Sequence, residues 1–163
     1  MNNYIVRAQK FIMSIAPYIE NARTIREYNK GIDEYLEDHP NRVVHTNSGI
    51  SRFVMITADY VIKVDYNTDT NFGTCEDELN NYKYVCEAGF GEYFAAITKF
   101  TYGYKNYYIM PKIGHINEED DDVYCHCPDD LTDFLYDNFR DMHSGNYGWK
   151  DGHPVIFDYA ASA

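Results

Sequence analysis

The chain has 163 residues with 45% hydrophobic content, which is enough for one compact domain with a real core. Its 26 acidic and 14 basic residues give a net charge of -12, which opposes attraction to a phosphate backbone and excludes ordinary nucleic-acid binding. No apolar run approaches the roughly 20 residues of a membrane span, and the first residues lack the apolar segment of a signal peptide. We therefore expect a cytoplasmic protein that contacts neither a membrane nor nucleic acid directly.

The four cysteines, Cys75, Cys86, Cys125 and Cys127, would allow two disulfides. In a chain expected in the cytoplasm, reduced thiols are the better expectation. The run "CHC" at 125–127 suggests zinc, but it lacks the C-x-x-C spacing that lets two thiolates share a tetrahedral ion. We therefore assign no metal to the cysteines.

The first 38 residues are predicted to form a helical extension. From Tyr4 to about Leu36, apolar residues recur at steps of three and four, which is typical of an amphipathic helix. Pro17 is expected to divide this segment into two helices, because proline is tolerated at the start of a helix and not in its interior. Their apolar stripe is expected to cover apolar surface elsewhere in the chain.

The next segments alternate between strand and helix patterns. Residues 42–66 predict a meander of three strands, separated by the turn signals "NSG" and "TAD". Residues 74–90 predict a helix, with Thr74 as its cap and Gly89 as its stop. Residues 93–113 predict two strands that are joined at Gly103 to Asn106.

The last third begins with an acidic run, Glu118 to Asp122, which is expected to form a solvated loop. A helix is predicted from Pro128 through "DDLTDFLYDNF". The segment "PVIFDYA" at 154–160 predicts a short apolar strand.

One polar motif precedes that last strand, and a second polar position lies near its end. In "RDMHSGN" an acid stands five residues before an amide, and Asp158 follows Asn146 by twelve residues. These spacings resemble the catalytic loop H-R-D-x-x-x-x-N and the D-F-G strand of protein kinases and kinase-like phosphotransferases. Asp141 then matches the catalytic aspartate, while Asn146 and Asp158 match the two metal ligands. Phe139 replaces the first histidine and Ala160 the last glycine of the family pattern.

The resemblance extends upstream along the chain. Lys63 in "YVIKV" resembles the lysine of V-A-I-K, and Glu78 is its expected ion-pair partner, with Glu76 the alternative. The strand end from Met110 to Lys112 resembles the hinge that receives adenine.

The glycine-rich loop of the family should lie in "TNSGISRFV", which contains a single glycine, Gly49. Ser48, Ser51 and the amides of this loop are expected to meet phosphate, although with less freedom of close approach than a glycine-rich loop has.

The resemblance implies an α+β, protein-kinase-like fold in one compact domain. Residues 39–112 would form an N-lobe with a five-stranded antiparallel sheet and one helix. Residues 113–163 would form a truncated, helical C-lobe with the catalytic and metal-binding loops, and residues 1–38 would be extra N-terminal helices. Five residues follow Asp158, so the family's activation loop and peptide-binding helices are expected to be missing.

The activity that the resemblance implies is phosphoryl transfer from ATP with Mg²⁺, of the Ser/Thr protein kinase type. Asp158 and Asn146 would bind the metal through oxygen atoms, and Lys63 would bind the α and β phosphates. Asp141 would accept the proton of the attacking hydroxyl.

The chain also resembles small kinase-like proteins of tailed bacteriophages, including relatives of the early kinase of T7-like phages. This implies action in the host cytoplasm on a host protein. The alternative is a catalytically inactive, pseudokinase-like scaffold that inhibits a host protein, with Glu118 to Asp122 imitating nucleic-acid phosphates. Nucleotide binding without transfer is a third reading. A small-molecule acceptor also stays open, because the loop resembles that of aminoglycoside phosphotransferases, and the oligomeric state is left undetermined.

Overall fold

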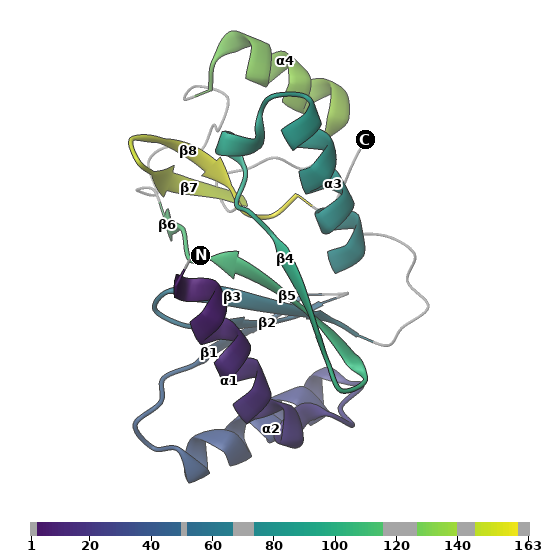
Figure 1. Ribbon diagram of the computed structural model, residues 1–163, viewed down its shortest axis with the longest axis vertical. Coiled ribbons are helices and arrows are strands. Elements are labelled where there is room, and N and C mark those ends of the chain that lie inside the picture. Colours follow the sequence, from purple (N-terminus) through teal and green to yellow (C-terminus); the bar gives the residue numbers. More distant parts are fainter. Residues whose placement is uncertain (1–2, 50–51, 67–73, 116–126, 140–145, 160–163) are drawn as a thin grey trace. The chain divides into compact units, whose positions relative to one another are not determined.

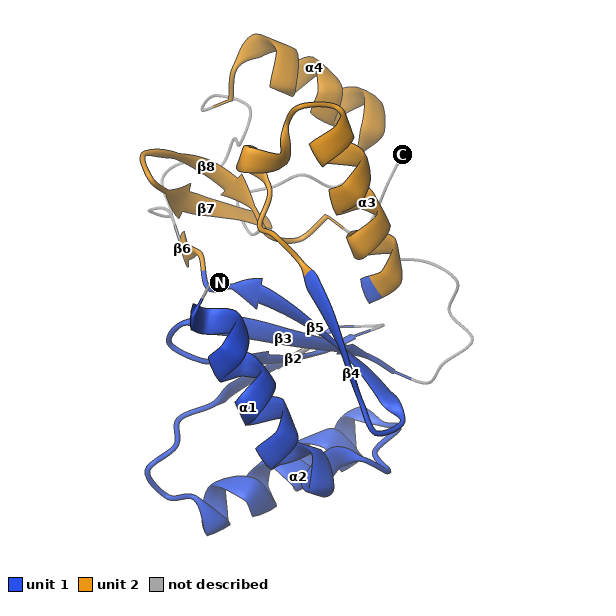
Figure 2. Cartoon of the chain, in the orientation of Figure 1, with its two compact units in different colours: residues 1–75, 98–112 blue, residues 76–97, 113–163 orange. Residues whose placement is uncertain are grey.

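The chain folds into two compact units of an α+β protein. The structure is a computed structural model that describes residues 3–49, 52–66, 74–115, 127–139 and 146–159 (Figure 1). Unit 1 consists of residues 1–75 and 98–112, and unit 2 of residues 76–97 and 113–163 (Figure 2). No helix in the described part of the chain combines the length and apolar character that a bilayer crossing needs.

Unit 1 begins with two helices, α1 (Asn3–Ile19) and α2 (Ile25–Asp38). Helix α1 continues through Pro17 to its last turn, so the expected division at Pro17 was wrong. The break follows it, and α2 starts at a capping box. The Thr24 hydroxyl accepts from the Glu27 N–H at 3.2 Å, and the Glu27 carboxylate accepts from the Thr24 N–H at 3.0 Å. These bonds satisfy donors that a helix start leaves without partners.

The other layer of unit 1 is a five-stranded antiparallel sheet with the strand order β1-β2-β3-β5-β4. Its strands are β1 (His45–Ser48), β2 (Arg52–Ile56), β3 (Tyr60–Asp65), β4 (Thr98–Tyr102) and β5 (Lys105–Pro111). The predicted meander and the predicted strand pair are confirmed. The turn between β4 and β5 is shorter than expected, because Lys105 and Asn106 already belong to β5. Gly103 supplies a positive φ of 61° in this turn.

Helices α1 and α2 pack on one face of this sheet and form the core of unit 1. Alternate strand residues point to this face, including Ile62 and Val64 of β3. The Tyr28 ring of α2 stacks on Phe53 of β2 with ring centroids 4.9 Å apart. The apolar stripe of the N-terminal helices is therefore buried against the sheet.

The two helices approach closely where α2 has a glycine. A Cβ atom on Gly31 would lie 2.3 Å from the Tyr18 carbonyl oxygen and 2.8 Å from the Ile19 side chain. Because the nearest of these atoms belongs to the main chain, a side chain at this position would push α1 and α2 apart.

Unit 2 holds most of α3 (Cys75–Glu87), the 3₁₀ turn η1 (Gly91–Tyr93), α4 (Asp129–Asn138) and a second sheet. Both predicted helices are confirmed. The sheet has the order β6-β7-β8, with β6 (Gly114–His115), β7 (Tyr147–Lys150) and β8 (His153–Ile156). Only the last of these strands was expected from the sequence, and β6 and β7 were not.

We predict that Gly31→Ala destabilises the protein, although alanine is the better helix former by about 1 kcal/mol. The added methyl must displace the Tyr18 carbonyl, and overpacking of this kind costs about 1–3 kcal/mol. Chemical denaturation measures the free energy of unfolding. Lys30→Ala, an exposed position next to it on α2, is the control and should change stability by less than about 0.5 kcal/mol. Equal or higher stability of Gly31→Ala would contradict the close helix packing.

Candidate functional site

The hairpin of β7 and β8 brings the two expected metal ligands of unit 2 together. Its strands pair from Tyr147↔Ile156 to Lys150↔His153. Just beyond the first pair, the Asn146 carbonyl oxygen accepts from the Phe157 N–H at 2.8 Å and from the Asp158 N–H at 3.4 Å. Asn146 and Asp158 thus meet at the open end of the hairpin through a main-chain hydrogen bond.

The closed end of the hairpin is a two-residue turn, Asp151-Gly152. Both residues have positive φ angles, 54° and 82°. This is the conformation of a type I′ turn, which matches the twist of the strands and favours Asp-Gly. The turn fixes the register of β7 on β8, and this register places Asn146 opposite the residues that follow Ile156.

The end of β8 is also held by the segment after η1. Phe94 forms a parallel bridge with Ile156, and the Ala95 N–H donates to the Ile156 carbonyl at 2.7 Å. The residue after Asp158 is anchored as well: the Tyr159 hydroxyl donates to the Ala95 carbonyl, and the Asn81 side-chain amide donates to the Tyr159 carbonyl at 2.7 Å.

The Tyr159 ring is 1% exposed and packs edge-on against Phe94, with ring centroids 5.2 Å apart. Asp158 itself is half-buried, and Asn146 is 9% exposed. The main chain on both sides of the Asp158 carboxylate is therefore fixed, which is what a metal-binding position requires.

Gly148 allows the hairpin to pair with β6. A Cβ atom at this position would lie 1.9 Å from the Gly114 carbonyl oxygen. Gly114 belongs to β6, so only glycine fits here. The glycine at position 148 thus has a steric cause in the three-stranded sheet.

In unit 1, Lys63 lies in β3 and is only 6% exposed. Its neighbours in the sheet are Val54 and Tyr108. Since Ile62 and Val64 point to the face that α1 and α2 cover, Lys63 points to the opposite face. Burying an ammonium group costs free energy unless polar contacts compensate for it. The packing of an ordinary core strand does not require a charged residue at such a position.

The two glutamates considered as partners of Lys63 differ in burial. Both lie in the first turn of α3, where their charge is favourable for the positive end of the helix. Glu78 is completely buried, whereas Glu76 is exposed. The first residue of this helix is fixed by β3, because the Cys75 N–H donates to the Asp65 carboxylate at 2.8 Å.

The expected nucleotide contacts of unit 1 lie at strand ends. Met110 is 1% exposed in β5, while Lys112 follows this strand, is exposed and donates its N–H to the Asp59 carbonyl at 3.0 Å. Ser48 ends β1, and the Gly49 N–H donates to the Arg52 carbonyl at 3.0 Å, which closes the turn to β2.

Three of the expected features lie outside the described residues: Ser51, the catalytic-loop Asp141 and the acidic run Glu118 to Asp122. Sequence reasoning missed Asn81 and Tyr159, which hold the Asp158 segment. No sequence signal identified Asn81, whereas the Asp-Gly pair at 151–152 is a hairpin signal that could have located β7.

No protein-family model and no curated protein matches this chain. Two solved structures match, one of the bifunctional kinase-methyltransferase WbdD and one of WbdD with the kinase inhibitor LY294002. The first is 16% identical over 69% of this chain and 30% of that chain, with a TM-score of 0.36. The second is 17% identical over 73% of this chain and 32% of that chain, with a TM-score of 0.37. This chain spans about a third of their length.

We predict that Gly148→Ala destabilises unit 2 by more than about 2 kcal/mol, because the methyl group cannot occupy the space of the Gly114 carbonyl. Lys150→Ala, an exposed position on the same strand, is the matched control. Amide hydrogen exchange of β7 and β8 measures the effect. Unchanged protection in Gly148→Ala would show that β6 and β7 do not pair as described.

Proposed function

We propose that this protein is a kinase-like phosphotransferase that uses ATP and Mg²⁺. The observation that supports this most is the double hydrogen bond from Phe157 and Asp158 to the Asn146 carbonyl. It brings a carboxylate residue and an amide residue together at the end of a hairpin, at the spacing that resembles the metal-binding pair of the kinases.

The donor set fits magnesium. Asn146 and Asp158 offer amide and carboxylate oxygens, the ligands that this hard cation prefers. Among the described residues there is no cluster of three or more His, Cys, Asp or Glu that could hold a metal by itself. A magnesium site with few protein ligands is the ordinary arrangement in enzymes that act on ATP, because waters and phosphate oxygens complete the octahedron. When bound, the metal neutralises the charge of the transferring phosphates.

Lys63 is assigned the α and β phosphates of the nucleotide. Lys63 is buried on the sheet face opposite to α1 and α2. A lysine that only keeps a strand soluble can stay exposed and avoid the cost of losing its hydration, so the burial of Lys63 supports a further role. We keep Glu78 rather than Glu76 for the role of the family's helix glutamate, because Glu78 is the buried one of the two. Adenine is assigned to the strand end from Met110 to Lys112, and phosphate contacts to Ser48, Gly49 and Ser51.

The acceptor in this proposal is a hydroxyl group of a host protein, and Asp141 would accept its proton. Both assignments come from the resemblance of the sequence to the kinases and to the small phage proteins. Binding of a host protein without phosphoryl transfer is the alternative, and the nucleotide experiment below separates the two.

Asp158→Asn and Asn146→Ala are each expected to weaken Mg²⁺-dependent ATP binding by at least about tenfold, because the first replaces a charged carboxylate ligand by a neutral amide and the second removes an oxygen ligand of the metal. Isothermal titration calorimetry with and without Mg²⁺ measures this. Neither change removes the main-chain hydrogen bonds that link Asn146 to Phe157 and Asp158, so both variants are expected to keep this link. Thermal unfolding checks this point.

Asp151→Asn is the matched control for charge. It makes the same carboxylate-to-amide change in the hairpin turn, where asparagine also tolerates the positive φ of 54°. Its ATP binding should equal that of the wild type. Wild-type protein that binds no ATP at millimolar concentration would sink the proposal and leave the inhibitory scaffold.

A further inference from the structure

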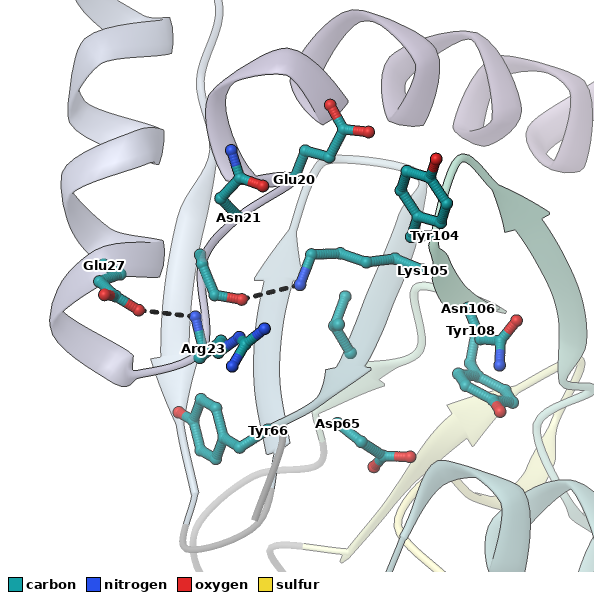
Figure 3. Close-up of a pocket in the computed structure, with 12 residues that line it drawn as sticks. Glu20, Asn21, Arg23, Glu27, Asp65, Tyr66, Tyr104, Lys105, Asn106 and Tyr108 are labelled. Atoms are coloured by element: carbon teal, nitrogen blue, oxygen red, sulfur yellow. Dashed lines mark hydrogen bonds between the residues drawn. The ribbon is translucent and has the colours of Figure 1, made fainter.

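A cavity of about 830 Å³ lies entirely within unit 1, where β3 and β5 separate (Figure 3). The two strands stay paired as far as Lys63↔Tyr108. Beyond this pair, the end of β3 and the start of β5 line the cavity, together with the segment between α1 and α2. The volume lies in the range of pockets that hold small-molecule ligands, about 300–1,000 Å³.

Lys105 at the start of β5 places a half-buried ammonium in this cavity. Its Nζ donates to the Ala22 carbonyl at 2.8 Å and to the Tyr28 hydroxyl at 2.7 Å. Both acceptors are neutral. An ammonium has three N–H donors, so one of them is left for a further acceptor in the cavity.

A second cation, the Arg23 guanidinium, points into the same cavity (Figure 3). Burial lowers the pKa of Lys105 and the charge of Arg23 lowers it further, which indicates that the two cations are close, while the charges of Glu20 and Glu27 raise it. Within the described residues, neither Lys105 nor Arg23 forms an ion pair. Because neither cation has a direct ion-pair partner there, an anion that enters the cavity can bind to both.

Two of the three carboxylates that line the cavity accept hydrogen bonds from main-chain N–H groups. Glu27 accepts from the N–H groups of Arg23 and Thr24 at the start of α2, at 2.7 and 3.0 Å. The Asp65 carboxylate accepts from the Cys75 N–H. Glu20, the third, is directed away from the Lys105 ammonium in the view of Figure 3, while its charge still raises the pKa of Lys105.

We propose that this cavity binds a small molecule with one phosphate or carboxylate group on an aromatic or heterocyclic body. The anion would lie between the Arg23 guanidinium, whose planar donors suit such groups, and the remaining Lys105 N–H. The side chains of Tyr66 and Tyr104, which also line the cavity, offer flat surfaces to the body of the ligand. This site uses none of the residues assigned to magnesium and ATP.

Phenyl phosphate is the first probe, titrated into the whole protein in buffer with EDTA and followed by amide NMR shifts. Saturable shifts are expected at residues 22–24, 64–66 and 105–106. Arg23→Gln should weaken binding by at least about tenfold, the loss expected for a charge-assisted hydrogen bond. The α2 capping box uses only main-chain atoms of Arg23, so this variant should keep its fold.

Arg26→Gln is the matched control, because Arg26 is an exposed arginine at the start of the same helix and does not line the cavity. It should bind like the wild type, and so should Asp158→Asn. Benzoate in place of phenyl phosphate tells a carboxylate site from a phosphate site, and uncharged benzyl alcohol should not bind. The proposal is overturned by absence of saturable binding of both anions, by equal loss in Arg26→Gln, or by loss in Asp158→Asn.

Discussion

The candidate site depends on one main-chain acceptor, the carbonyl oxygen of Asn146. Because it receives the N–H groups of both Phe157 and Asp158, it joins the two ends of the β7–β8 hairpin. The Asp151-Gly152 turn sets the register that makes this bond possible, and Gly148 lets the hairpin pair with β6. Since main-chain atoms form this link, the link itself does not depend on the chemistry of the side chains at 146 and 158.

Local sequence signals predicted most of the larger elements. Alternation and turn residues located the three-strand meander, and an apolar stripe located the N-terminal helices. The helix break was predicted at Pro17, whereas the structure has it before the capping box of Thr24 and Glu27. Both signals are visible in the sequence. Strand β6 has two residues, too few for a periodic signal, and its pairing with β7 depends on the distant Gly148.

The candidate site was harder to predict from the sequence than the fold. Periodicity cannot bring Asn146 and Asp158 together, and only the spacing shared with kinase motifs suggested their pairing. The cavity of unit 1 had no signal at all, since the Lys105 ammonium meets the Ala22 carbonyl across 83 positions of the chain. Contacts of this kind follow from the register of β5 on β3 and from the break between α1 and α2, neither of which a local pattern determines.

The central claim is that Asn146 and Asp158 form one metal-binding pair. Mn²⁺ can replace Mg²⁺ at an oxygen-ligand site, and its unpaired electrons broaden the NMR signals of nearby nuclei. With ATP present, substoichiometric Mn²⁺ should selectively broaden the amides of residues 146–148 and 156–159 in the wild type, and Asp158→Asn should abolish this broadening. Uniform broadening in the wild type, or the same selective pattern in Asp158→Asn, would contradict the claim.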